Sequence, residues 1–327
     1  MKCSLRKTLA ILSFTAITTF SWYSGKIGSK KVQNTKKPQI TVKMSAANEQ
    51  DSIITYEQYT SIPAKILEKH FAVNGQYTTF NTDIVVYNRL AKCGSTTLFR
   101  IVQQVSSDNN FTFVMDHNDS STVNFNDKQI VNYIDSFSKP VFYVRHMSFV
   151  NFTAFGKQHP VYIQMLRDPV ERVISGYYYY DFHFGHHKGI RLEKCLVYNM
   201  KCGLLKPGDM RNQFCDRQTR KMNKCTIEHV KRIIEKDYIF VGITEHFSES
   251  IKAFAKLLPK YFPENATIAI QNSAKEARGS SNLRPPDRIM NFLAKRYEID
   301  YEVYNFAKQH FYKRLSEMGI SYGRKVQ

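Results

Sequence analysis

The chain has 327 residues, of which 43% are hydrophobic and 13% are aromatic. This composition excludes a disordered protein and provides enough apolar side chains for one large core. Lysine and arginine number 47 against 28 acidic residues, so the formal charge of +19 predicts a polyanionic partner. Charge alone does not distinguish nucleic acid, a membrane surface and an acidic polysaccharide.

The N-terminal region contains an uncharged stretch, residues 8–25, between Lys7 and Lys26. It is just long enough to span a thin bilayer. Because the short segment 1–7 before it is basic, we expect a single-pass type II signal anchor with the bulk of the chain in the lumen. A cleaved signal peptide is the alternative. The polar, basic residues 26–75 suit a stem, which leaves residues 76–327 as a luminal domain.

Two further patterns fit a secretory address. Sequons for N-glycosylation occur at Asn110, Asn118, Asn151 and Asn265. Four of the six cysteines fall in one stretch, at Cys195, Cys202, Cys215 and Cys225. In an oxidising lumen these cysteines pair most simply with their neighbours, as Cys195–Cys202 and Cys215–Cys225. Zinc binding is the alternative, although the spacings differ from CxxC.

Strand and helix patterns alternate from Asp83 onward. Apolar runs predict strands at 83–87, 111–115, 141–144, 161–166 and 238–244. Helical patterns occupy residues 127–137, 226–236, 248–259 and 286–318. A serine is expected to cap the third of these helices, and the fourth pattern is long enough to be interrupted once. This alternation predicts an α/β fold in which a parallel sheet is flanked by helices, with ligands at the carboxyl ends of the strands.

The segment that follows the first strand, "KCGSTT" (92–97), has the composition of an anion site. Apolar residues at helical spacing follow it, so it lies at a helix N-terminus, where backbone N–H groups lack partners. Gly94 permits a close backbone approach, Ser95, Thr96 and Thr97 add hydroxyl donors, and Lys92 adds charge. It is not a Walker loop, because Lys92 precedes the glycine. A capped helix with an incidental lysine is the alternative.

A second strand-to-helix corner lies at "LRDPVERVIS" (166–175). Asp168 is expected to cap the helix, with Pro169 in the first position and Glu171 completing a capping box. A phosphate here would therefore be held by side chains, Arg167 and Ser175. The alternative is that Arg167 pairs with an acidic neighbour.

Histidines supply two further candidates. His146 follows a strand directly and is a candidate general base, although a lone histidine is more often structural. His183, His186 and His187 form a cluster that fits either a metal site or a polar loop. The four tyrosines at 177–180 cannot all face one way on a helix, so part of the run belongs to the core and part is available to a cleft.

Five segments together resemble the uronyl and heparan sulfate 2-O-sulfotransferases of the Golgi, from about residue 80 to 320. They are "VVYNRLAKCGSTT", "FYVRHMSFVNFTAFG", "PVYIQMLRDPVERVISGYYYY", "YIFVGITE" and "KRYEIDYEVYNFAKQHF". The resemblance implies the P-loop-like sulfotransferase fold and 3′-phosphoadenosine 5′-phosphosulfate (PAPS) as donor. The acceptor it implies is the 2-hydroxyl of a hexuronic acid in a glycosaminoglycan. It also implies a Golgi membrane address and a homotrimer. Val144 stands where heparan-type members have a second histidine, which favours the uronyl type.

The resemblance also implies roles for individual residues. Lys92, Cys93, Gly94, Ser95, Thr96 and Thr97 form the 5′-phosphosulfate loop, Arg167 and Ser175 bind the 3′-phosphate, and Arg278 closes over the nucleotide. His146 is the expected catalytic base, with Lys92 as its catalytic partner, and Arg89 faces the acceptor. No metal is expected, since lysine, arginine and the helix dipole supply positive charge.

Two other functions compete with this hypothesis. A basic luminal lectin that has lost catalysis would bind sulfated glycans, but it would not require this set of lysine, arginine, serine and histidine. Nucleic-acid binding would explain the charge, but not the anchor, the sequons or the cysteines.

Overall fold

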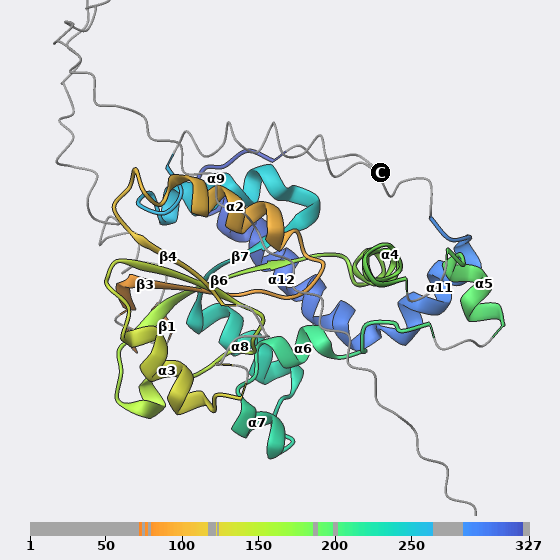
Figure 1. Ribbon diagram of the computed structural model, residues 1–327, viewed down its shortest axis with the longest axis horizontal. Coiled ribbons are helices and arrows are strands. Elements are labelled where there is room, and N and C mark those ends of the chain that lie inside the picture. The colour runs from red at the N-terminus through yellow and green to blue at the C-terminus, as the bar shows by residue number, and fades with distance from the viewer. Residues whose placement is uncertain are drawn as a thin grey trace, which may run out of the picture. The chain divides into compact units, whose positions relative to one another are not determined.

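Five parallel strands form the central sheet of the computed structural model, in the spatial order β4-β5-β3-β6-β7 (Figure 1). Their bounds are β3 Phe80–Asn88, β4 Thr112–Asp116, β5 Val141–Arg145, β6 His159–Leu166 and β7 Tyr238–Ile243. Strands β1 (Ala72–Val73) and β2 (Gln76–Tyr77) form a separate antiparallel pair. The structure describes residues 72–73, 76–77, 80–116, 122, 124–185, 189–198, 202–263 and 284–322. The predicted parallel α/β fold is confirmed.

Helices cover both faces of this sheet. Helices α2 (Ser95–Val105) and α9 (Phe247–Leu257) lie on one face, and α3 (Asp127–Asp135) and α8 (Ile227–Asp237) lie on the other (Figure 1). The long helix α12 (Glu298–Glu317) packs against α8 and β7. The remaining helices are α4 Pro169–Phe184, α5 Leu192–Val197, α6 Asp209–Gln213, α7 Arg217–Lys221 and α11 Asp287–Arg296, with 3₁₀ turns at Thr153–Phe155 and Thr244–His246.

The apolar runs explain the sheet. Every residue of β5, β6 and β7 is buried, as expected of parallel strands with helices on both faces. In α2 the periodic residues Leu98, Ile101 and Val102 are buried against the sheet. The C-terminal helical pattern is broken once, at Tyr297 between α11 and α12, as expected.

The expected serine cap of the helix after β7 is wrong. Helix α9 begins at Phe247 and has His246 as its N-cap, without a side-chain capping bond. The 3₁₀ turn Thr244–His246 leads directly into this helix, so Ser248 lies inside the first turn rather than before it.

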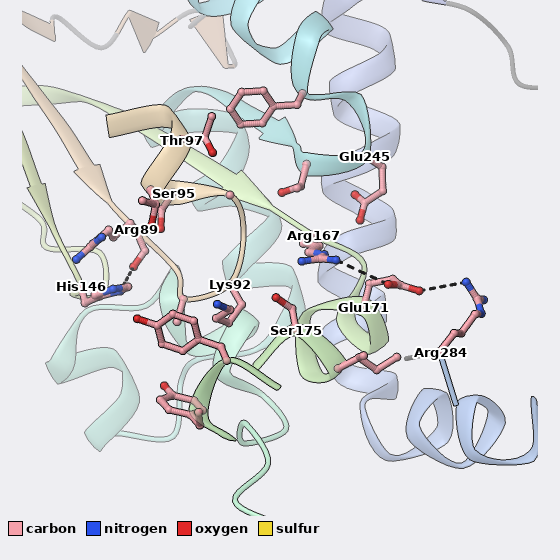
Figure 2. Close-up of a pocket in the computed structure, with 18 of the residues that line it drawn as sticks. Arg89, Lys92, Ser95, Thr97, His146, Arg167, Glu171, Ser175, Glu245 and Arg284 are labelled. Atoms are coloured by element: carbon pink, nitrogen blue, oxygen red, sulfur yellow. Dashed lines mark hydrogen bonds and ion pairs between the residues drawn. The ribbon is translucent and has the colours of Figure 1, made fainter. Parts of the chain in front are cut away.

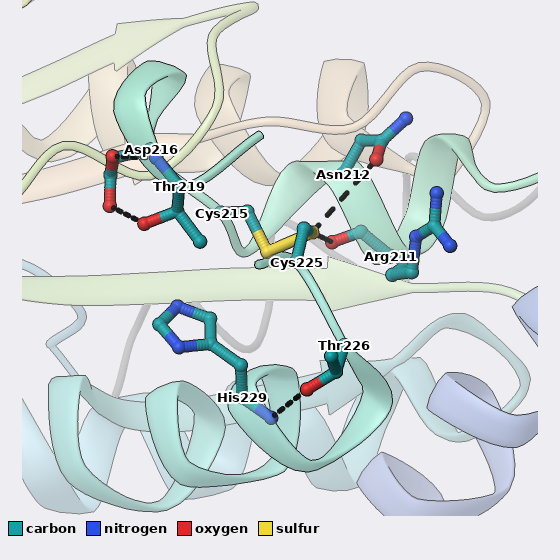
Figure 3. The surroundings of a disulfide bond; sticks show 8 residues. All are labelled: Arg211, Asn212, Cys215, Asp216, Thr219, Cys225, Thr226 and His229. Atoms are coloured by element: carbon teal, nitrogen blue, oxygen red, sulfur yellow. Dashed lines mark hydrogen bonds between the residues drawn. A yellow bond between two sulfur atoms is a disulfide. The ribbon is translucent and has the colours of Figure 1, made fainter. Parts of the chain in front are cut away.

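Both predicted disulfides, Cys195–Cys202 and Cys215–Cys225, are present. Figure 3 shows the second of them. Each disulfide closes a short loop: the first begins in α5, and the second encloses α7. Among the described residues, no helix is long and apolar enough to cross a membrane. The expected anchor, residues 8–25, lies outside that part of the chain.

Candidate active site

A large cleft opens where the carboxyl ends of β3, β5 and β6 meet the N-termini of α2 and α4 (Figure 2). Its volume is about 1490 Å³. Figure 2 shows Arg89 and His146 at one end, Arg284 at the other, and Lys92 between them. Nine of the predicted site residues line it: Arg89, Lys92, Gly94, Ser95, Thr96, Thr97, His146, Arg167 and Ser175. The two corners predicted from the sequence therefore face one common space.

The first corner presents an uncapped helix N-terminus to the cleft. Gly94 is the N-cap of α2, with φ of 72°, and no side chain caps this end. Lys92 also has a positive φ, of 67°. The N–H groups of the first turn of α2 therefore point into the cleft without a side-chain acceptor, which is the arrangement that binds phosphate in other proteins.

Two side chains that the sequence analysis missed hold this loop in place. The buried Arg172 of α4 donates from Nε to the carbonyl oxygen of Ala91, at 3.0 Å. The hydroxyl of Thr244 lies 3.1 Å from the carbonyl oxygen of Cys93 and 2.9 Å from that of Leu166. The loop is thus fixed by both neighbouring elements before any ligand arrives.

Cys93 does not offer its side chain to the cleft. The thiol is fully buried, and burial raises its pKa to about 11. Lys92 and Gly94 line the cleft, whereas the side chain of Cys93 packs in the core. The expected role of Cys93 in binding the donor is therefore restricted to its backbone.

Lys92 carries its ammonium group over an aromatic ring. Its Nζ lies 3.5 Å from the ring centroid of Tyr179, a cation–π contact. Burial, followed by the charge of Arg167, lowers the pKa of Lys92 to about 8. Tyr179 and Tyr180 line the cleft while Tyr177 is buried, so the tyrosine run divides between cleft and core as expected.

The second corner is capped, but not by the expected box. The Asp168 carboxylate accepts from the N–H groups of Val170 and Glu171, as predicted. The N–H of Asp168 donates to Glu245 at 2.9 Å, so the expected capping box with Glu171 is wrong. Glu245 can accept this hydrogen bond because it follows β7, whose end lies beside the end of β6. The carboxylate of Glu171 instead forms ion pairs with Arg167 and Arg284.

The C-terminal helix supports this corner. The hydroxyl of Tyr301 lies within 3.1 Å of both carboxylate oxygens of Asp168, and the hydroxyl of Tyr304 donates to Glu245 at 3.1 Å. Both tyrosines belong to α12. The tyrosine-rich tail therefore fixes the start of α4.

Arg167 both lines the cleft and pairs with an acid. One of its terminal nitrogens lies 3.7 Å from Glu171, and Arg284 reaches the same carboxylate at 3.3 Å. These ion pairs are partly exposed and therefore weak. A phosphate with two or more charges would compete effectively for Arg167, so the ion pair and the expected phosphate contact are compatible.

His146 lies beside the first corner. Its Nδ1 is 3.0 Å from the carbonyl oxygen of Arg89. A carbonyl oxygen only accepts, so Nδ1 carries the proton, and Nε2 is the basic nitrogen of the neutral ring. Arg89 itself is 9% exposed, its guanidinium lies over the ring of Phe99, and burial lowers its pKa.

Several predicted residues lie elsewhere. His183 is in the last turn of α4 and packs against Tyr179. Asn110 is exposed, whereas Asn151 is half-buried and accepts from Thr153 of its own sequon. Arg278, His186, His187, Asn118 and Asn265 fall outside the described residues. Within those residues, no group of three His, Cys, Asp or Glu side chains is arranged to hold a metal.

Comparison with known proteins identifies relatives of this chain. Human uronyl 2-sulfotransferase is 25% identical over 272 residues, which cover 72% of this chain and 64% of the human protein. Heparan sulfate 2-O-sulfotransferase 1 of Xenopus laevis is 24% identical over 250 residues, 70% of each chain. The Drosophila melanogaster uronyl 2-sulfotransferase homolog pip is 24% identical over 74% of this chain and 54% of its own. The chain thus spans less than two thirds of the length of the uronyl-type relatives. Residues 75–307 match the model of the sulfotransferase family, and the chain belongs to that family.

Proposed function

We propose that this protein transfers sulfate from PAPS to the 2-hydroxyl of hexuronic acid residues in a glycosaminoglycan, of the dermatan, chondroitin or heparan type. The observation that carries the proposal is the meeting of two basic strand-to-helix corners and one histidine in a single cleft. The relatives named uronyl 2-sulfotransferase and heparan sulfate 2-O-sulfotransferase support the acceptor class.

The residues present fit a nucleotide that carries a 3′-phosphate and a 5′-phosphosulfate. The uncapped N-terminus of α2, with Ser95, Thr96, Thr97 and Lys92, would hold the 5′-phosphosulfate. Arg167 and Ser175, at the second corner, would hold the 3′-phosphate. When bound, PAPS supplies the sulfuryl group. The second corner needs side chains for this purpose because Asp168 already occupies N–H groups of α4.

The remaining residues act on the acceptor. His146, through Nε2, would remove the proton from the 2-hydroxyl as that oxygen attacks the sulfuryl group. Lys92 neutralises the negative charge that develops on the leaving phosphate oxygen. Arg89 lies next to His146 in the cleft and would bind an acidic group of the acceptor chain.

The cellular arrangement is part of the same proposal. Residues 1–7 would lie in the cytoplasm, 8–25 would anchor the chain in the Golgi membrane, 26–75 would form a stem, and 76–327 would form a luminal domain. The two disulfides support an oxidising compartment. A homotrimer is the proposed assembly, and glycosaminoglycan chains of proteoglycans are the proposed partners.

The test is incubation of the luminal domain with radiolabelled PAPS and desulfated heparan, dermatan and chondroitin chains, followed by disaccharide analysis. We expect new sulfate at the 2-position of uronic acid. Binding of the polysaccharide without transfer would favour the lectin. Sulfate on a hexosamine carbon would contradict the proposed acceptor.

A further inference from the structure

Gln213, the last residue of α6, joins two strand ends that carry proposed site residues. The residue is 7% exposed. The carboxamide Nε2 donates to the carbonyl oxygen of Asn88 and to that of Met147, the latter at 2.7 Å. Asn88 ends β3, and Met147 lies two residues beyond the end of β5.

The two carbonyl groups flank the end of the cleft where the acceptor would bind. Asn88 directly precedes Arg89, and Met147 directly follows His146. The His146 Nδ1 contact with the Arg89 carbonyl crosses the same gap between the two chain segments. The backbone oxygen of Gln213 also accepts a hydrogen bond from the N–H of Phe149, at 2.8 Å. Gln213 therefore makes two hydrogen bonds to the segment after β5 that contains His146, which we call the His146 segment.

Helix α6 is too short to hold Gln213 by itself, but it is fixed at both ends. At its start, the buried Asp300 of α12 accepts from the N–H groups of Gly208 and Met210, at 2.9 Å each. Just past its end, Cys215 is bonded to Cys225 (Figure 3). Gln213 therefore has a fixed base from which it adds a side-chain bridge between the neighbouring segments that follow β3 and β5.

We infer that Gln213 is a positioning residue: it acts through His146, whose ring it keeps aligned with Arg89 and the acceptor hydroxyl. Among uncharged side chains, only the primary amides of Asn and Gln carry two N–H donors on one nitrogen, so a single atom of Gln213 can bridge both carbonyl oxygens. The inference rests on the proposed role of His146 as base. Gln213 lies 67 positions after His146 in the sequence and is not among the residues that line the cleft.

The test is Gln213→Met, which keeps the side-chain length and removes both donors. We expect kcat to fall by about tenfold or more, while the affinity for adenosine 3′,5′-bisphosphate stays within about twofold of wild type, because neither phosphate corner is touched. Gln213→Leu also removes both donors without burying a charge opposite two carbonyl oxygens, and it serves as a second variant if the methionine protein does not fold. A kcat within about threefold of wild type in a folded variant overturns the inference.

Gln164→Met is the matched control. Gln164 is fully buried and also donates to the Asn88 carbonyl, at 2.6 Å, but no described hydrogen bond joins it to the His146 segment. A general weakening at the end of β3 would affect both variants alike. An equal loss of kcat in Gln164→Met therefore counts against a specific role for Gln213.

A double variant and a spectroscopic measurement separate this inference from the proposed function. If Gln213 acts through His146, adding Gln213→Met to His146→Ala should change residual turnover little. The Nδ1–H resonance of His146, assigned by its loss in His146→Ala, should be shifted or lost in Gln213→Met. An unchanged resonance overturns the inference even if the wild-type protein transfers no sulfate. A wild-type protein without transfer contradicts the proposed function alone.

Discussion

The Nδ1 atom of His146 lies 3.0 Å from the carbonyl oxygen of Arg89, a residue 57 positions earlier in the chain. The contact joins the segment after β5 to the segment after β3, and it fixes the tautomer of the ring. A histidine held in this way presents Nε2 as its basic nitrogen. The geometry needed for a general base is therefore present before any acceptor binds.

His146→Ala tests this role directly. We expect kcat to fall by about 10² to 10⁴, the usual contribution of a positioned general base. The affinity for adenosine 3′,5′-bisphosphate should remain close to wild type, because the proposed phosphate ligands are residues other than His146. Transfer of radiolabelled sulfate and calorimetric titration give the two quantities. Turnover within about tenfold of wild type would remove His146 from the role of base.

The pH dependence of nucleotide binding should report Lys92. Burial and the charge of Arg167 lower the pKa of Lys92 to about 8, so in the free protein it loses its charge above that pH. A bound polyanion favours the charged form and raises this pKa. Affinity should therefore be nearly constant below about pH 7 and decline above about pH 8, since binding then requires uptake of a proton.

Lys92→Arg provides the comparison for this pH dependence. The guanidinium stays charged across the range, so the decline above pH 8 should disappear even if the absolute affinity changes. Titrations with adenosine 3′,5′-bisphosphate between about pH 6.5 and about pH 9.5 measure the effect. The same slope in both proteins would show that another group is responsible.

Local patterns predicted the parts of the site that depend on local structure. The apolar runs placed the strand ends, and glycine and basic residues at those ends identified Lys92, Gly94, Arg167 and His146. Apart from the serine cap of α9, which the preceding 3₁₀ turn displaces, the failures involve long-range contacts. Glu245 replaces Glu171 as partner of the Asp168 N–H across 77 positions, and Gln213 reaches Asn88 across 125. A single sequence contains no local feature that selects such partners, since both depend on which strand ends become neighbours.

Gly94→Ala tests whether the shape of the first corner governs donor binding. The positive φ of Gly94 costs about 1 to 2 kcal/mol with any Cβ. The added methyl would lie 3.4 Å from Phe247 and 3.5 Å from Thr244, which is ordinary contact, so backbone strain is the main effect. If the loop moves to relieve this strain, bisphosphate affinity should fall by about tenfold, as calorimetry can measure.

Gly156→Ala is the control for that strain. Gly156 has a φ of 71°, and a Cβ there would have no neighbour within 4 Å. It does not line the cleft. We expect both alanine variants to lower the melting temperature, but only Gly94→Ala to weaken bisphosphate binding. Equal affinities in the two variants would contradict a role for the loop shape.

The two disulfides should differ in function although they resemble each other in size. They close segments with sequence separations of 7 and 10, so removing either should lower the free energy of unfolding by about 3 kcal/mol through loop entropy.

Cys215 lies two residues after Gln213, whereas Cys195 and Cys202 pack in a separate cluster with α4 and α11. Paired serine substitutions at Cys215 and Cys225 should therefore also reduce kcat, and those at Cys195 and Cys202 should not. Denaturant unfolding and turnover, measured on both variants below their melting temperatures, decide the matter. Equal kcat in the two folded variants would mean that the Cys215–Cys225 bond stabilises the chain without supporting the base.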